Sequence, residues 1–185
     1  MKPAIIRLSL IMCLLTSPAW AALNPGDAAP DFTLQAAQAG KDFSFHLADS
    51  LKSGPVVVYF YPKSFTKGCT AEAHDFAEAI GDFAAAGASV IGISADPIAV
   101  QKDFSSLECR DKFPVAADPD RSVIHAYDAA RATPTASGEI LADRISYVIS
   151  PQGAVLLTTI DKSPEKHIEA SLEAVRQWRQ AHPAK

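Results

Sequence analysis

The amino-acid sequence predicts an α/β fold in which a central mixed sheet is flanked by helices. Short runs of β-branched and aromatic residues alternate with amphipathic stretches along the chain, which is typical of this class. The continuous run VVVYFY at residues 56–61 suits a strand that is covered on both faces. No internal repeat or low-complexity linker divides the 185 residues.

The start of the chain has the composition of a secretory signal peptide, which we assign to residues 1–21. Lys2 and Arg7 precede or flank a short apolar run at residues 8–15, and Ala19-Trp20-Ala21 forms an A-x-A cleavage site. The apolar run is well short of the roughly 20 residues that cross a bilayer. We therefore expect a single domain at residues 22–185 in the periplasm, with no membrane attachment once the signal is removed.

The expected strands and helices follow from hydrophobic spacing and turn residues. Pro30 confines the first strand to an edge or a strand start, and Pro151-Gln152-Gly153 makes a hairpin turn. The expected strands are residues 29–34, 56–61, 89–93, 115–117, 145–149 and 154–160. The expected helices are residues 70–86, 97–108, 122–127 and 164–181. This order fits a thioredoxin-type sheet with extra N-terminal strands.

Composition and motifs argue against several functions. The net charge is −4 and basic residues are not clustered, so we expect no nucleic-acid partner. The glycine-rich fingerprints of nucleotide binders are missing, and no close group of His, Cys and Asp has zinc-ligand spacing. We therefore expect neither a cofactor nor a metal.

Cys69 stands where a strand-to-helix turn ends and the next helix begins. Open α/β sheets place reactive groups at such turns, beyond the carboxyl ends of their strands. The thiolate is the nucleophilic form, and only about a few per cent of an ordinary cysteine is ionised at neutral pH. A helix start stabilises the thiolate in part, and a nearby cation adds to this effect. The pattern predicts a nucleophilic cysteine.

Arg144, at the start of the strand expected at residues 145–149, is the candidate cation, because that strand should lie close to the central one. Glu72 follows Cys69 by three residues on the same helix face, and a bare carboxylate there would oppose the thiolate. We therefore expect Glu72 to pair with Arg144 and to hold its guanidinium in place. Thr66 is expected to cap the helix by accepting from the Cys69 N–H, and Pro62 to shield the sulfur from water.

The spacing Pro62-x-x-x-Thr66-x-x-Cys69 resembles the active-site signature of the peroxiredoxins. The longer run FYPKSFTKGCTAE at residues 60–72 resembles the bacterioferritin-comigratory, or Q-type, subgroup. Residues 26–34 and 144–149 are similar to the opening segment and the arginine-bearing strand of that family, so the resemblance covers nearly all of the chain after residue 21. It implies a thioredoxin-like fold with the peroxiredoxin N-terminal extension.

The resemblance also implies a reaction. Cys69 would attack a peroxide, either hydrogen peroxide or an organic hydroperoxide, and become a sulfenic acid. Thr66, Arg144 and the Cys69 amide would bind the peroxide and stabilise the departing oxygen. An external thiol donor, usually thioredoxin in the family, would complete the cycle without a metal, haem or flavin. A monomer or a homodimer is expected.

The sequence departs from many Q-type members at His74, where they carry a second cysteine. Cys109 is then the candidate resolving cysteine, and Arg110 and Lys112 beside it are expected to favour its thiolate. A disulfide needs Cα atoms within about 7 Å, which a folded helix start at Cys69 is not expected to allow. We therefore expect the two sulfurs to lie apart in the reduced protein, and the first turn to unwind before they pair.

Two alternatives remain open. A thioredoxin-like disulfide oxidoreductase would carry C-x-x-C at the helix start, but Thr66 takes the first of those positions. A periplasmic copper chaperone on a similar fold would place two cysteines in the loop, where this chain has one.

Overall fold

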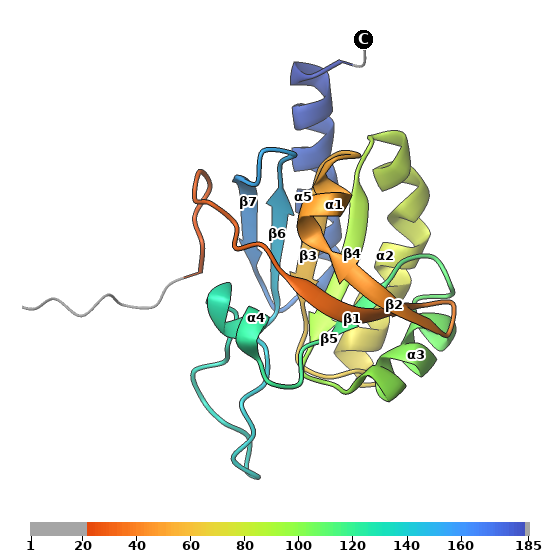
Figure 1. Cartoon of the computed structure of the whole chain (residues 1–185), viewed down its shortest axis with the longest axis vertical. Coiled ribbons are helices and arrows are strands. Elements are labelled where there is room, and N and C mark those ends of the chain that lie inside the picture. The colour runs from red at the N-terminus through yellow and green to blue at the C-terminus, as the bar shows by residue number, and fades with distance from the viewer. Residues whose placement is uncertain (1–21, 184–185) are drawn as a thin grey trace, which may run out of the picture.

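The computed structural model describes residues 22–183 and contains a seven-stranded sheet with five helices around it (Figure 1). The predicted signal peptide lies outside the described residues. The strands are β1 (Thr33–Gln38), β2 (Lys41–His46), β3 (Val56–Phe60), β4 (Ser89–Ser94), β5 (Val115–Ala117), β6 (Ile145–Ile149) and β7 (Val155–Ile160). The helices are α1 (Leu47–Leu51), α2 (Lys67–Ala85), α3 (Ile98–Leu107), α4 (Ser122–Ala126) and α5 (Pro164–Ala181).

The sheet is mixed, as predicted, with the strand order β2-β1-β5-β4-β3-β6-β7. β3, β4 and β5 run parallel to one another, whereas β6 pairs antiparallel with β3 and β7 pairs antiparallel with β6. Phe60, the last residue of β3, is opposite Ile145, the first residue of β6. The end of β3 and the start of β6 therefore meet at one edge of the sheet, which brings Pro62 and Arg144 together although 82 residues separate them.

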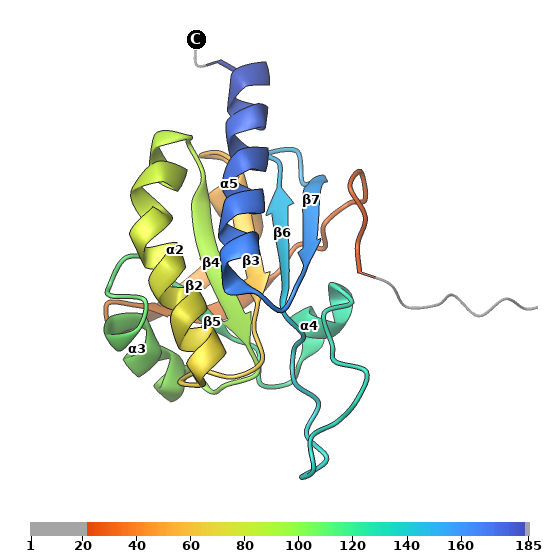
Figure 2. The ribbon, with the colours of Figure 1, turned by 180° about the vertical axis from the view of Figure 1, so that it is seen from behind.

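Side chains from β3 alternate between two buried cores. Val56, Val58 and Phe60 belong to the core under α1 and α4, whereas Val57, Tyr59 and Tyr61 belong to the core under α2, α3 and α5. The two layers of helices lie on opposite faces of the sheet (Figures 1 and 2). This arrangement confirms the strand predicted from VVVYFY, because a strand covered on both faces needs no polar side.

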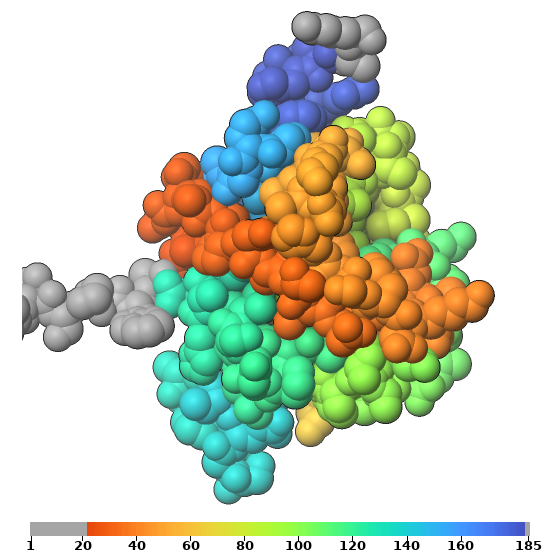
Figure 3. All heavy atoms as spheres, viewed as in Figure 1, coloured from red at the N-terminus to blue at the C-terminus, as the bar shows by residue number. Residues whose placement is uncertain are grey.

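The N-terminal part of the chain departs from the predicted elements. The first strand is β1 and begins at Thr33, whereas residues 29–34 were expected, and upstream of it Ala28 makes only an isolated bridge to Ala154. β2 and α1 were not predicted. Together with β1 they form a layer across the face of the molecule seen in Figure 3. Ala and Gln have little intrinsic preference for strands, so the pairing of β1 with both β2 and β5 decides its conformation.

No helix among residues 22–183 is both long and apolar enough to span a bilayer.

Candidate active site

The loop between β3 and α2 carries the predicted motif and is held at several points. The backbone N–H of Ser64 donates to Asp96 Oδ2 at 2.7 Å, which ties the loop to the end of β4. Phe65 adopts a left-handed backbone conformation with φ of 62°, and its ring packs edge-on against Phe104 of α3. A non-glycine residue holds this conformation only where its surroundings fix it. The loop therefore enters α2 in one defined direction.

Cys69 is the third residue of α2, which begins at Lys67, three residues before the predicted start. Its side chain is 2% exposed, and the Arg144 Nη2 donates to its Sγ at 3.5 Å. Among the described residues nothing accepts from the Cys69 N–H, as expected in the first turn of a helix. A thiolate at this sulfur would thus face a guanidinium and the positive end of a helix, both of which stabilise negative charge.

Arg144 pairs with Glu72, as predicted. The Arg144 Nη1 donates to Glu72 Oε2, and the Glu72 side chain is completely buried. Burial raises the pKa of Glu72 to about 8, an effect that outweighs the opposing pull of the Arg144 guanidinium. Glu72 Oε1 has no hydrogen-bond partner among the described residues. The pair fixes the direction of the guanidinium, and burial shifts the Glu72 carboxyl toward its protonated form.

Gly68 makes room for this guanidinium. A Cβ at Gly68 would lie 3.2 Å from Arg144 Nη2, which is closer than ordinary packing allows. The arginine therefore lies directly over the first turn of α2, beside the sulfur.

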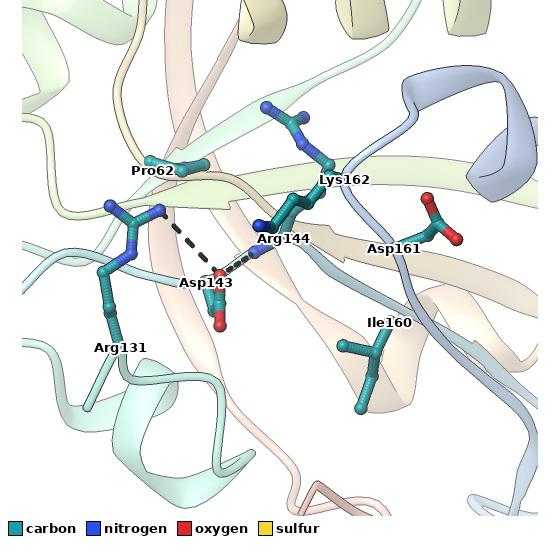
Figure 4. A pocket seen from close by; sticks show the side chains of 7 residues that line it. All are labelled: Pro62, Arg131, Asp143, Arg144, Ile160, Asp161 and Lys162. Atoms are coloured by element: carbon teal, nitrogen blue, oxygen red, sulfur yellow. Dashed lines mark hydrogen bonds and ion pairs between the residues drawn. The ribbon is translucent and has the colours of Figure 1, made fainter. Parts of the chain in front are cut away.

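Thr66 occupies the N-cap position of α2, but the predicted cap is wrong. Its hydroxyl donates to the backbone carbonyl of Lys63 at 2.9 Å, and no side-chain cap bond to the Cys69 N–H forms. In this orientation the hydroxyl oxygen does not reach the Cys69 N–H, which stays without an acceptor among the described residues. Pro62 lies in the same loop, directly after Tyr61, and together with Arg144 it lines a surface hollow of about 650 Å³ (Figure 4).

Cys109 follows the end of α3 and is completely buried. Cys69 and Cys109 are free thiols, as expected for the reduced protein. The expectation that Arg110 and Lys112 favour the Cys109 thiolate is wrong. Burial raises the pKa of Cys109 well above its ordinary value, and the Glu108 carboxylate adds to this shift. Arg110 instead pairs with Glu78 of α2, with its Nη1 3.2 Å from Glu78 Oε1.

Comparisons with known proteins match this arrangement to one family. A family model described as the AhpC/TSA family matches residues 25–157. The chain belongs to this family, the peroxiredoxins. A chloroplastic peroxiredoxin Q of Populus jackii is 35% identical over 158 residues, which cover 85% of this chain and 70% of the relative. A putative peroxiredoxin of Mycobacterium tuberculosis is 46% identical over 110 residues, which are 58% of this chain and 65% of the relative, just under two thirds of its length.

Solved peroxiredoxin structures share the fold. The crystal structure of peroxidoxin BcpB from Mycobacterium tuberculosis matches with a TM-score of 0.73 and 30% identity, covering 83% of this chain and 96% of that one. A Xylella fastidiosa PrxQ mutant matches with a TM-score of 0.74 at 23% identity, over 85% of this chain and 98% of that one, a likeness of fold alone. These relatives place the chain in the Q, or bacterioferritin-comigratory, subgroup.

This peroxiredoxin also has a buried hydrogen-bond network that sequence reasoning missed. The Gln101 amide, completely buried on α3, accepts from the Tyr61 hydroxyl at 2.7 Å. It donates to Ser94 Oγ at 2.8 Å and to the Ala116 carbonyl at 3.0 Å. Ser94 Oγ in turn donates to Asp96, which holds the active-site loop. The network links the loop to three elements of the fold. A lone Gln in an amphipathic helix is usually solvated, so the sequence held no signal for this role.

Across residues 22–183 no group of three or more His, Cys, Asp or Glu side chains is arranged to hold a metal ion.

Proposed function

We propose that this peroxiredoxin is a thiol-dependent peroxidase that reduces hydrogen peroxide and organic hydroperoxides at Cys69. One observation carries the proposal: the Arg144 guanidinium, fixed by a buried carboxyl group, lies 3.5 Å from a cysteine sulfur in the first turn of a helix. This combination supports a thiolate and also supplies donors for an oxygen that gains charge.

The proposed step transfers one oxygen atom. The Cys69 thiolate attacks the near oxygen of the peroxide, an S–O bond forms and the O–O bond breaks. Cysteine becomes a sulfenic acid, and the departing hydroxide or alkoxide takes up a proton to leave as water or an alcohol. Arg144 and the free N–H groups at the start of α2 are the donors that stabilise the departing oxygen. In this scheme the Thr66 hydroxyl, which now donates to Lys63, can turn to accept from or donate to the bound peroxide.

Regeneration is the second half of the proposal. Cys109 attacks the sulfenic acid to give a disulfide and water, and a thiol donor of the thioredoxin type reduces that disulfide. Both cysteines are buried, so this step requires local opening of the chain. The proposed location is the periplasm, and the proposed state is a monomer or homodimer.

Peroxide consumption by two single-cysteine variants tests the proposal. Cys69→Ser should abolish turnover with every donor, because the attacking sulfur is lost. Cys109→Ser should keep the first oxidation and lose turnover only with donors that reduce disulfides. Turnover in Cys69→Ser equal to that of the wild type would exclude Cys69 as the attacking residue. A separate assay of insulin disulfide reduction distinguishes a disulfide oxidoreductase from a peroxidase.

A further inference from the structure

The surface hollow beside Arg144 is built from three segments that are far apart in sequence. Pro62 comes from the active-site loop, and Arg131 and Asp143 come from the two ends of the segment between α4 and β6. Residues 160–162 come from the end of β7 and the connection that follows it to α5. Figure 4 shows these side chains around one opening. At about 650 Å³ the hollow falls in the size range of sites that bind small organic molecules.

The charges that line the hollow are not balanced. Three cations, Arg131, Arg144 and Lys162, face two carboxylates, Asp143 and Asp161. Asp161 is already neutralised from outside the hollow, because Lys166 Nζ lies 2.8 Å from its Oδ2 and lowers its pKa.

Arg144 already pairs with Glu72 of α2, so the remaining acid, Asp143, faces the two other cations, Arg131 and Lys162. Its Oδ1 accepts from the Arg144 backbone N–H at 3.0 Å and lies 3.8 Å from Arg131 Nη2, a long and half-exposed ion pair. Lys162 is exposed, and no carboxylate of residues 22–183 lies within ion-pair distance of its amine. Arg131 and Lys162 are therefore available to a bound anion.

The hollow also has an apolar wall that meets the reactive centre. Ile160, at the end of β7, is 62% exposed, and Pro62 lies on the active-site loop. Arg144 belongs to both places, since it lines the hollow and its Nη2 contacts the Cys69 sulfur. The hollow therefore adjoins Arg144, the residue whose guanidinium contacts the Cys69 sulfur.

We propose that this hollow is a specificity site for organic hydroperoxides that carry a carboxylate. The peroxide group lies at Cys69 and Arg144, the organic part packs against Pro62 and Ile160, and the carboxylate binds between Arg131 and Lys162. The inference rests on the proposed peroxidase function and adds a substrate class to it. Hydrogen peroxide is too small to use the hollow, so the site acts on choice among organic substrates.

Matched substrates and matched variants test the site. The probes are cumene hydroperoxide with a para-carboxylate and the methyl ester of the same compound, which is similar in shape without the charge. The variant is Arg131→Gln with Lys162→Gln, and the control is Arg176→Gln with Lys52→Gln. The control removes two cations that pair with surface carboxylates elsewhere. The measured quantity is the ratio of kcat/KM for the carboxylate to kcat/KM for the ester.

The ratio should fall about tenfold in the Arg131/Lys162 variant, since the loss of each exposed cation should lower kcat/KM for the carboxylate by up to about fivefold. In the control variant the ratio should stay within about twofold of the wild-type ratio. An equal fall for both substrates, or an equal change in the control, would overturn the proposal.

Calorimetry supplies a readout that does not depend on turnover. The ligand is the alcohol product of the carboxylated probe, which has no peroxide bond to react. It should bind the wild type and the control variant and bind the Arg131/Lys162 variant at least about threefold more weakly. If the wild type consumes no peroxide but shows this binding difference, the peroxidase proposal fails while the anion site stands. If the alcohol binds the wild type and the Arg131/Lys162 variant equally well, the proposed anion site is excluded, whether or not the protein consumes peroxide.

Discussion

At the scale of single residues, Arg144 contacts two groups that compete for it. Its guanidinium reaches the Cys69 sulfur with Nη2 and the Glu72 carboxyl with Nη1. A fully ionised Glu72 would take up much of the arginine's charge. Burial raises the pKa of Glu72 to about 8, which favours the protonated form of this carboxyl group over the ionised form. The carboxyl group then orients the guanidinium while leaving its positive charge for the sulfur.

Protonation of Glu72 makes a prediction about stability and pH. The pKa of this carboxyl is about 8 in the folded chain against 4.5 for a free glutamate, so between these values the folded state binds more protons than the unfolded state. The free energy of unfolding should therefore fall as pH rises from about 4.5 to about 8, by an amount on the order of a few kcal/mol.

Urea unfolding of the reduced protein at several pH values between 5 and 8 measures this slope. Glu72→Gln should remove the contribution of Glu72 to this slope, because the amide does not titrate. Glu173→Gln, on the surface of α5, should leave the slope as in the wild type. If Glu72→Gln and the wild type follow the same pH dependence, the buried carboxyl is not protonated in the folded state.

At the scale of elements, β4 needs a glycine at residue 92 because the Tyr59 side chain of β3 packs against it. A Cβ at Gly92 would meet the Tyr59 ring at 2.5 Å, so the glycine allows this buried tyrosine to lie against the strand. Tyr59 also stacks on Phe76 of α2, with ring centroids 4.5 Å apart. The packing of α2 on the sheet, and with it the position of the helix start, thus depends on a missing side chain in β4.

Gly92→Ala should destabilise the fold by about 1–3 kcal/mol, because a side chain forced into a packed core displaces the tyrosine. Gly81→Ala is the matched control. Gly81 lies in α2, and a Cβ there has no neighbour within 4 Å, so alanine should stabilise the helix by about 0.5–1 kcal/mol. Denaturant unfolding of both variants measures whether the free energy of unfolding falls in Gly92→Ala and rises in Gly81→Ala. Equal effects of the two substitutions would show that Tyr59 does not need the space over Gly92.

The site was predictable from the sequence where charge and spacing decide the geometry. A turn followed by an amphipathic helix fixed the place of Cys69, and the need to neutralise Glu72 predicted its contact with Arg144. The helix cap predicted at Thr66 was wrong. The left-handed backbone at Phe65 helps to set where the Thr66 hydroxyl points, and the sequence gives no signal for that conformation. Gln101 gave no signal, because its burial comes from elements that meet only in the folded chain.

Some strands and helices were likewise predictable from the sequence, and others were not. β3 and β6 were found from their own residues because both strands are fully buried and consist mainly of β-branched and aromatic residues. β2 and α1 were missed, since Lys41–His46 alternates only weakly and the five residues of α1 are stable only through Leu47 and Leu51 packing on the sheet.

At the scale of the whole molecule, the proposed resolution step requires two buried segments to open. Cys109 is completely buried, and side-chain contacts hold the chain on both sides of it to α2. His74 Nε2 lies 2.7 Å from Glu108 Oε2, and Arg110 pairs with Glu78. His74, five residues after Cys69, thus contacts the Cys109 segment. We expect oxidation of Cys69 to favour opening because its sulfenic acid adds an oxygen to a buried sulfur.

One equivalent of peroxide should therefore increase hydrogen exchange in the first turn of α2 and around Cys109, and leave β3 and β6 protected. Mass spectrometry of the non-reduced protein should then find a Cys69–Cys109 disulfide. Persistent sulfenic acid at Cys69 with a free Cys109, and no change in exchange, would refute resolution within one chain. Cys109→Ser is the control, since it should stop at the sulfenic acid.

The contact between Arg144 and Cys69 is the claim on which the account depends most, and the rate of Cys69 oxidation by hydrogen peroxide tests it directly. Stopped-flow measurement of the single oxidation step should give a rate constant about 10²–10³-fold lower in Arg144→Gln than in the wild type, because a charged donor at the sulfur and at the departing oxygen is lost. Circular dichroism would confirm that the variant is folded. A folded Arg144→Gln protein that reacts at the wild-type rate would contradict the account.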